Sequence, residues 1–142
     1  MSTTPALPPS APSVIRETSS PSVRLFWLDI PGVMSRLRRA ARRLAQTHPE
    51  IEEIWLFGSL ARGEATPASD ADIVLVLSHS SRPFLERPPD YALEDCGVAT
   101  DILAYTRAEM QGMRAQANPF LRQIESERRI LWQRGRGIEG RE

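Results

Sequence analysis

Hydrophobic residues form three short runs along the chain, at residues 54–57, 73–77 and 98–105. The runs are rich in β-branched and aromatic side chains, which is typical of strands buried inside a sheet. Polar and proline-containing segments separate the runs. We therefore predict three core strands within one sheet.

Residues 32–47 have the spacing of an amphipathic helix. The predicted inner stripe consists of Val33, Leu37, Ala40, Ala41 and Leu44. The other faces carry Arg36, Arg38, Arg39, Arg42 and Arg43. We interpret these arginines either as a solvated face or as a docking surface for an acidic protein or for RNA.

Two helix-start signals follow the third predicted strand. Thr106 and Glu109 have the spacing of a capping box, which predicts a helix over residues 107–116. Asn118 followed by Pro119 is a second start signal. We expect this second helix to continue to Leu131 or Trp132. Its predicted core-facing stripe is Phe120, Leu121, Ile124, Ile130 and Leu131.

Prolines mark the segments that lack a regular pattern. Residues 78–95 contain three prolines, which predict a loop with one helical turn near residues 91–95. Residues 1–22 are rich in Pro, Ser, Thr and Ala, and we expect them to be disordered or to lie extended on a partner. Residues 23–30 suit either a short strand or a turn. The predicted domain spans residues 23–133, and residues 134–142 form a frayed end.

The most specific chemistry lies between the first two predicted strands. Gly58 and Ser59 follow the first strand directly, and Asp70 and Asp72 open the second. Because side chains alternate along a strand, both aspartates project from the same side. Two carboxylates on one face are costly unless positive charge lies between them, and divalent cations are the natural candidates.

These residues resemble the signature of the nucleotidyltransferase superfamily that includes DNA polymerase beta, and above all its small stand-alone members. The matching residues are Gly58, Ser59, Ala61, Arg62, Gly63, Ser69, Asp70 and Asp72. The resemblance covers residues 33–133 and implies an α/β fold, a small mixed β-sheet flanked by helices. It also implies a third carboxylate on the next strand, and Asp101 is the candidate. The alternative for Asp101 is a strand-start residue that pairs with an arginine.

The resemblance implies a two-metal reaction, in which a hydroxyl attacks the α-phosphorus of a nucleoside triphosphate and pyrophosphate leaves. Asp70 and Asp72 are expected to hold two Mg²⁺ ions, with Mn²⁺ as the alternative metal. Asp101 is expected to bind the metal nearer the nucleophile and to accept its proton. The residues expected to bind ATP or another nucleotide are Gly58, Ser59, Arg62 and Ser69.

The role of Arg62 leaves two alternatives open. Arg62 is either a phosphate clamp or a structural bridge to Glu64 or Asp70. The loop at residues 78–95 is expected near the metal end of the second strand, where it could shape the acceptor site.

Composition and net charge argue against several classes of protein and of binding site. The formal net charge is 0, so no global field draws the protein to nucleic acid or membrane. All 18 basic residues are arginine. The single Cys96 excludes an internal disulfide, and neither it nor the two histidines has zinc-ligand spacing. Without a long apolar run or a signal-peptide pattern, we expect a soluble cytoplasmic protein.

Two functions follow from the resemblance. The first is a nucleotidyltransferase that moves AMP from ATP onto a protein or RNA hydroxyl. Small relatives act as antitoxins of a HEPN-class toxin, so a HEPN-like protein partner or a second copy of the chain is expected. The second is a non-catalytic module that binds a nucleotide or a partner. Modification of a small-molecule antibiotic is a third and weaker alternative.

Overall fold

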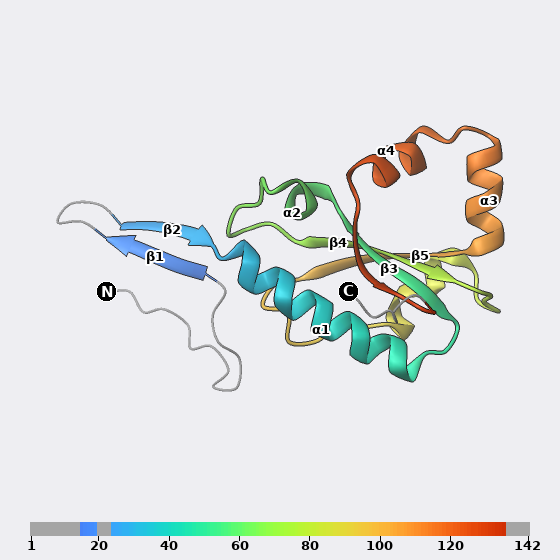
Figure 1. The fold of residues 1–142 in the computed structure, drawn as a ribbon, viewed down its shortest axis with the longest axis horizontal. Coiled ribbons are helices and arrows are strands. Elements are labelled where there is room, and N and C mark those ends of the chain that lie inside the picture. Colours follow the sequence, from blue (N-terminus) through green and yellow to red (C-terminus); the bar gives the residue numbers. More distant parts are fainter. Residues whose placement is uncertain (1–14, 20–23, 136–142) are drawn as a thin grey trace.

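A four-stranded mixed sheet forms the centre of the computed structural model, which describes residues 15–19 and 24–135 (Figure 1). Its strands lie in the order β5 (Thr100–Thr106), β4 (Ala71–Leu77), β3 (Ile51–Phe57) and β6 (Arg129–Gln133). β4 and β5 run parallel, whereas β3 pairs antiparallel with both β4 and β6. The three predicted strands are therefore present, and the α/β prediction with a mixed sheet is confirmed.

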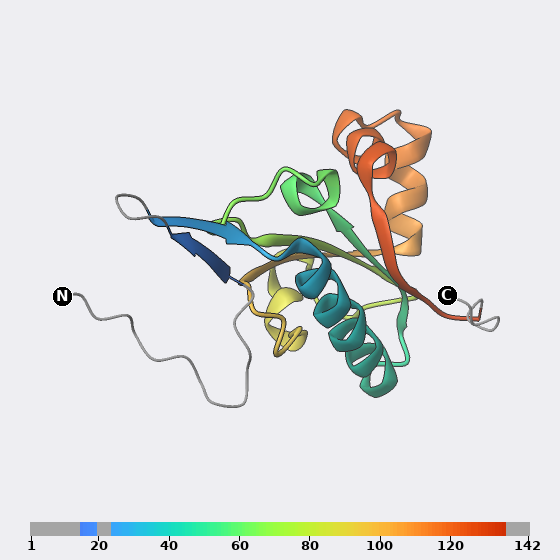
Figure 2. The same ribbon diagram turned by 60° about the vertical axis from the view of Figure 1, so that its left-hand side comes forward.

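Helices cover both faces of this sheet (Figures 1 and 2). Helix α1 (Ile30–Thr47) packs on one face, against Ile54 and Leu56 of β3 and the alternate β4 residues Ile73, Leu75 and Leu77. Helices α3 (Arg107–Ala115) and α4 (Pro119–Glu127) pack on the other, where Met110, Leu121 and Ile124 meet Trp55, Val74 and Val76. The period-2 alternation of the strands thus assigns each strand residue to one of two cores.

Side-chain caps explain where the helices begin. The Asp29 side chain accepts a hydrogen bond from the backbone N–H of Gly32 at 3.2 Å, so α1 starts at Ile30 and the predicted helix is confirmed. Both hydrogen bonds of the predicted capping box at Thr106 and Glu109 are present. Asn118 caps α4 through the backbone N–H of Leu121 at 3.0 Å.

The prediction that the last helix continues to residue 131 or 132 is wrong. Helix α4 ends at Glu127, Arg128 is extended, and the next residues form β6 along the open edge of β3. A strand there satisfies the backbone groups of both β3 and β6, which a longer helix could not do. Leu131 is buried against the α1 side, but Ile130 is 38% exposed, so only part of the expected stripe faces the core. Phe120, at the start of α4, is 46% exposed.

The connection between β4 and β5 contains two short 3₁₀ turns, η1 (Phe84–Glu86) and η2 (Pro88–Asp90). The turn expected near residues 91–95 is therefore wrong, because the prolines at 83, 88 and 89 place helical geometry earlier in the loop. Residues 91–95 are irregular, and the Tyr91 hydroxyl donates to Glu50 Oε2 at 2.7 Å.

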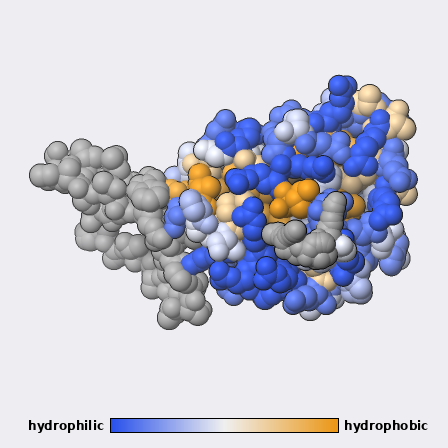
Figure 3. Space-filling model, in the orientation of Figure 1, coloured by the Kyte–Doolittle hydropathy of each residue, from blue (hydrophilic) through white to orange (hydrophobic). Residues whose placement is uncertain are grey.

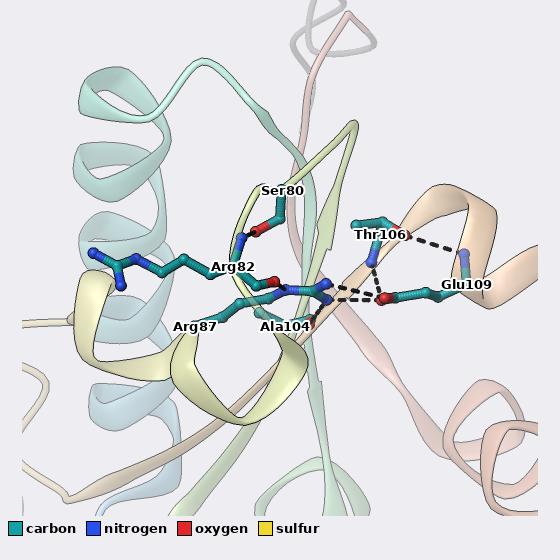
Figure 4. A network of polar contacts seen from close by, with 6 residues as sticks. All are labelled: Ser80, Arg82, Arg87, Ala104, Thr106 and Glu109. Atoms are coloured by element: carbon teal, nitrogen blue, oxygen red, sulfur yellow. Dashed lines mark hydrogen bonds and ion pairs between the residues drawn. The ribbon is translucent and has the colours of Figure 1, made fainter.

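A buried arginine anchors this connection (Figure 4). The Arg87 guanidinium donates to the carbonyls of Arg82 and Ala104, each at 2.9 Å, and pairs with both carboxylate oxygens of Glu109 at 2.7 and 3.0 Å. Because Glu109 also caps α3, one side chain joins the loop to β5 and α3. The hydrogen bond between Arg87 and Glu109 is the largest cause of two shifts. It raises the pKa of Arg87 and lowers the pKa of Glu109.

This anchor corrects the expected location of the loop. The turns η1 and η2 lie beside the end of β5 and the start of α3, whereas Asp72 lies at the opposite, N-terminal end of β4. A strand rises about 3.3 Å per residue, so Leu77 lies about 16 Å from Asp72 along β4. Only the last part of the loop returns to the Asp72 end, where the Ala99 carbonyl accepts from the Ala71 N–H at 2.8 Å.

A second, two-stranded sheet precedes α1 and projects from the body of the molecule (Figures 1 and 2). Its strands β1 (Ile15–Ser19) and β2 (Arg24–Leu28) are antiparallel. The strand alternative considered for residues 23–30 is therefore the one that forms, and residues 15–19 of the expected tail lie in β1. Residues 1–14, 20–23 and 136–142 lie outside the described residues.

The face shown in Figure 3 is mainly hydrophilic, including the region over α1. Within the described ranges, no helix is both long and apolar enough to cross a membrane.

Candidate functional site

Two of the candidate carboxylates stand side by side on neighbouring strands. Asp72 of β4 and Asp101 of β5 are register partners in the parallel pair. Their alternate neighbours Val74, Leu103 and Tyr105 belong to the α3–α4 core, so both aspartates stand on that face of the sheet. Asp70 is exposed and lies two residues before Asp72, just ahead of β4. The structure therefore brings the three predicted aspartates to one edge.

The turn at Gly58 lies against Asp72. Gly58 has a φ of +78°, a conformation that side chains rarely adopt. A Cβ placed there would lie 2.2 Å from Asp72 Oδ2. Only glycine allows the chain to turn from β3 into helix α2 (Gly58–Arg62) while Asp72 keeps this position.

Ser59 and Ser69 connect the two halves of the motif. Ser59 Oγ donates to Ser69 Oγ at 3.4 Å, and Ser69 Oγ accepts from the backbone N–H of Thr66 at 2.9 Å. These contacts fold the polar loop between α2 and β4 back onto the Gly58 turn. Ser59 and Ser69 are both half-buried.

Glu127, the last residue of α4, also reaches this turn, which sequence reasoning missed. Its Oε2 accepts from the backbone N–H of Gly58 at 2.7 Å, and its two oxygens accept from Arg62 Nη1 at 3.1 and 3.2 Å. Only 12% of the Glu127 side chain is exposed. Gly58 and Glu127 are 69 residues apart, so no local spacing could have indicated this contact.

Arg62 forms a bridge, with a different set of partners from the one considered. Its Nε donates to Glu64 at 3.0 Å, as one alternative anticipated, and its Nη1 pairs with Glu127 instead of Asp70. These hydrogen bonds, to Glu64 first and then to Glu127, raise the pKa of Arg62. Its side chain remains 40% exposed, so it can still turn toward a ligand.

The electrostatics of the site are dominated by negative charge. Burial is the main cause of the raised pKa of Asp72, followed by the charges of Asp101, Asp70 and Glu127, while Arg62 opposes them. Burial acts in the same direction on Glu127, but hydrogen bonds from Gly58 and Arg62 outweigh it and lower the pKa of Glu127. The charged form of Glu127 is therefore stabilised by its hydrogen bonds, whereas the charged form of Asp72 would be stabilised by a nearby cation.

The donor set at this edge suits a hard divalent cation. Asp70, Asp72 and Asp101 offer only carboxylate oxygens, the ligands that Mg²⁺ and Mn²⁺ prefer. In the described part of the chain no three metal-ligating side chains already converge on one point. Burial first, and then the negative charges of Asp101, Asp70 and Glu127, raise the pKa of Asp72 there. The three aspartates thus fit divalent metal ions, because they offer oxygen ligands and because their negative charges need a cation between them.

The region of the chain that matches a protein-family model includes the whole of this site. The model of the nucleotidyltransferase domain matches residues 35–131, from α1 through β6. The chain belongs to this nucleotidyltransferase domain family. The match includes every candidate residue, and the family prediction made from the Gly58–Asp72 segment is confirmed. Among curated proteins, none matches the sequence significantly.

Solved structures of similar fold have low sequence identity to the chain. A putative nucleotidyltransferase from Sulfolobus solfataricus is 19% identical, with a TM-score of 0.48 over 74% of this chain and 84% of the other. A toxin-antitoxin complex with AMP-PNP is 18% identical, with a TM-score of 0.49 over 72% and 77%. A mutant of the toxin-antitoxin MntA-HpeT is 15% identical, with a TM-score of 0.47 over the same shares.

Proposed function

We propose that the protein transfers a nucleoside monophosphate, AMP from ATP, onto a hydroxyl group of a protein or RNA acceptor. The observation that carries this proposal is the pairing of Asp72 with Asp101, directly beside the Gly58 turn. Carboxylates on two adjacent strands supply metal ligands and a proton acceptor at one edge. The neighbouring turn supplies a backbone donor and an arginine for phosphate.

Asp70, Asp72 and Asp101 would hold two Mg²⁺ ions, or Mn²⁺ in their place. When bound, these ions would neutralise the negative charge that builds on the phosphate oxygens and on the leaving pyrophosphate. Asp101, in register with Asp72, would accept the proton of the attacking hydroxyl, because its carboxylate is exposed on the open edge.

The nucleotide phosphates would be bound by groups around the turn. The Gly58 N–H, which donates to Glu127 at 2.7 Å in this structure, would be the backbone donor of the turn. The half-buried hydroxyls of Ser59 and Ser69 are hydrogen-bonded to each other and can exchange that bond for phosphate oxygens. Arg62 would add a charged donor. These residues orient the triphosphate so that its α-phosphorus faces the carboxylate edge.

The acceptor would be presented by a protein partner, a HEPN-like toxin in the antitoxin hypothesis, or by a second copy of the chain. Support comes from a shallow surface hollow on α1 lined by Pro31, Ser35, Arg38, Arg39 and Arg42. Arg43, the next residue of α1 after Arg42, donates to the Glu94 carbonyl of the loop before β5 at 3.0 Å. An acidic partner protein fits this charge. RNA is the alternative ligand for the same arginines.

Transfer of label from ATP tests the proposed function. The protein is incubated with ATP labelled at the α-phosphate, with Mg²⁺, and with candidate acceptors, alone and together with the product of a neighbouring gene. Label on a protein or RNA hydroxyl that disappears in the Asp70→Asn/Asp72→Asn variant supports transfer. Tight partner binding that survives in this variant, without label on any acceptor, would instead support the non-catalytic module.

A further inference from the structure

Both phosphate donors of the turn are already engaged by an anion of the protein itself. The Gly58 N–H and Arg62 Nη1 converge on the single carboxylate of Glu127. The shortest of these contacts, from Gly58 to Oε2, is 2.7 Å. The carboxylate is largely buried, and hydrogen bonds to a charged acceptor are about twice as strong as neutral ones.

We propose that Glu127 occupies the place of a nucleotide phosphate and is an intramolecular competitor that ATP must displace. This inference rests on the proposed function and deepens it, because it names how access to the same site is controlled. A backbone N–H has one proton to donate, so Gly58 cannot serve Glu127 and a phosphate oxygen fully at the same time. Arg62 has five N–H donors, but its Nε already donates to Glu64 and its Nη1 to Glu127, so its positive charge is shared by two carboxylates.

Charge gives a second reason for displacement. The charge of Glu127 is felt at Asp72, together with the charges of Asp70 and Asp101. A triphosphate brought to the turn would add several negative charges beside a carboxylate that is already there. Unless Glu127 moves away, the repulsion reduces the affinity for the nucleotide.

The surroundings indicate that the side chain moves while the helix stays in place. Leu121 and Ile124 of α4 are buried in the core. Directly after Glu127, the Arg128 guanidinium lies 4.2 Å from the centroid of the Trp55 ring on β3. Glu127 is therefore flanked by anchored residues, and rotation of its own side chain frees Gly58 and Arg62. The resulting device has a closed state with Glu127 on the turn and an open state with nucleotide there.

Substitution of Glu127 by glutamine separates this role from a purely structural one. Glu127→Gln keeps the size of the side chain but removes its charge. Since hydrogen bonds to a charged acceptor are about twice as strong as neutral ones, we expect ATP–Mg²⁺ to bind at least about tenfold more tightly to this variant. The matched control is Glu125→Gln, which removes the same charge two residues earlier. Glu125 Oε2 pairs with Arg114 Nη2 at a distance of 2.6 Å, and this pair does not include the Gly58 turn. Its affinity for ATP should equal that of the wild type.

Titration calorimetry of the three proteins with ATP and Mg²⁺ distinguishes the outcomes. Tighter binding by Glu127→Gln alone supports the competitor. Unchanged or weaker binding by Glu127→Gln, with normal binding by the other two proteins, overturns it and assigns Glu127 to positioning the turn. Absence of ATP binding by all three overturns the proposed function, and the competitor with it.

A measurement on the wild-type protein covers the case in which Glu127→Gln does not fold. The Glu127 carboxyl carbon and the Gly58 amide are followed by NMR during titration with ATP and Mg²⁺. Displacement predicts that both resonances shift with the same dependence on ATP concentration. A Gly58 amide that shifts while the Glu127 carboxyl resonance stays constant would overturn the proposal, because phosphate would then bind without moving Glu127.

Discussion

Asp72 lies so close to Gly58 that a single methyl group on Gly58 would come within 2.2 Å of its Oδ2 atom. Gly58 follows the end of β3 and Asp72 lies at the start of β4, yet each limits which residue can stand at the other position. The metal-binding carboxylate and the phosphate-binding turn of the proposed site are therefore in direct contact. A change in one is expected to disturb both.

Gly58→Ala is expected to destabilise the protein by about 1–2 kcal/mol, because alanine is strained at a φ of +78° and must displace Asp72. ATP binding should be lost in the folded variant. Gly112→Ala is the control with the opposite sign. A Cβ at Gly112 in α3 meets nothing within 4 Å, so alanine should stabilise the helix by about 0.5–1 kcal/mol. Denaturant unfolding measures both. A Gly58→Ala protein as stable as the wild type would contradict the contact.

The Asp70→Asn/Asp72→Asn variant is expected to lose the Mg²⁺-dependent part of ATP binding, because the remaining carboxylate Asp101 cannot hold the nucleotide metal alone. Calorimetry with and without Mg²⁺ measures this difference. The fold should be kept, since asparagine has nearly the same shape as aspartate and removes from position 72 a charge that burial and the neighbouring carboxylates disfavour. Equal ATP binding by variant and wild type would exclude these aspartates as the metal site.

Asp101→Asn should reduce nucleotidyl transfer by at least about 10²-fold, the usual scale for loss of a general base. ATP binding should persist, because Asp70 and Asp72 remain. Single-turnover transfer and ATP affinity are measured on the same folded sample. Asp101 would be a structural residue if the variant lost thermal stability while transfer per folded molecule stayed constant.

The pair formed by Arg87 and Glu109 should make the thermal stability of the protein depend on pH in the acidic range. The pKa of Glu109 is lowered below its ordinary value of 4.5, first by the hydrogen bond from Arg87. This contribution is therefore complete above about pH 4.5 and is lost as the pH falls through the lowered folded-state pKa. Thermal melting between about pH 6 and pH 3 should show a shallower decline in Glu109→Gln than in the wild type. Glu86→Gln, on the exposed turn η1, serves as the control and should follow the wild-type curve.

Charge reversal on α1 should slow association with an acidic partner. Replacing Arg38 and Arg42 by glutamate changes the field around the surface hollow without touching the carboxylate edge. Rim charges act mainly on the association rate and on its dependence on salt. Stopped-flow or surface-based kinetics at two salt concentrations would measure the change. An unchanged association rate would place the partner on another surface.

Much of the geometry of the candidate site could be predicted from the sequence because its signals are local. Gly58, Asp70 and Asp72 lie within one strand–turn–strand segment, where the period of a strand fixes which side chains share a face. Asp101 required one further step, because the family resemblance and not local spacing implied a third carboxylate on the next strand. The structure pairs this residue with Asp72 in the parallel register of β4 and β5.

The parts that were missed depend on contacts distant in sequence. The apolar run at residues 130–132 suits a helix or a strand equally, and the open edge of β3 decides in favour of β6. Glu127 reaches the turn only because β6 returns beside β3 and places the end of α4 there. The position of the proline-rich loop was misjudged for the same reason. The pairing of Arg87 with Glu109 and the Ala104 carbonyl, which fixes the loop, has no local signature.

The separation of this loop from the carboxylate edge offers a practical site for attachment. Leu85 on η1 is 84% exposed and stands at the end of the sheet opposite Asp72. Exposed loop tips of this kind tolerate insertions well. A fluorophore or affinity tag introduced at Leu85 should report on assembly of the protein with other molecules while leaving the proposed nucleotide site undisturbed. The fold thus allows the two ends of one sheet to be engineered independently.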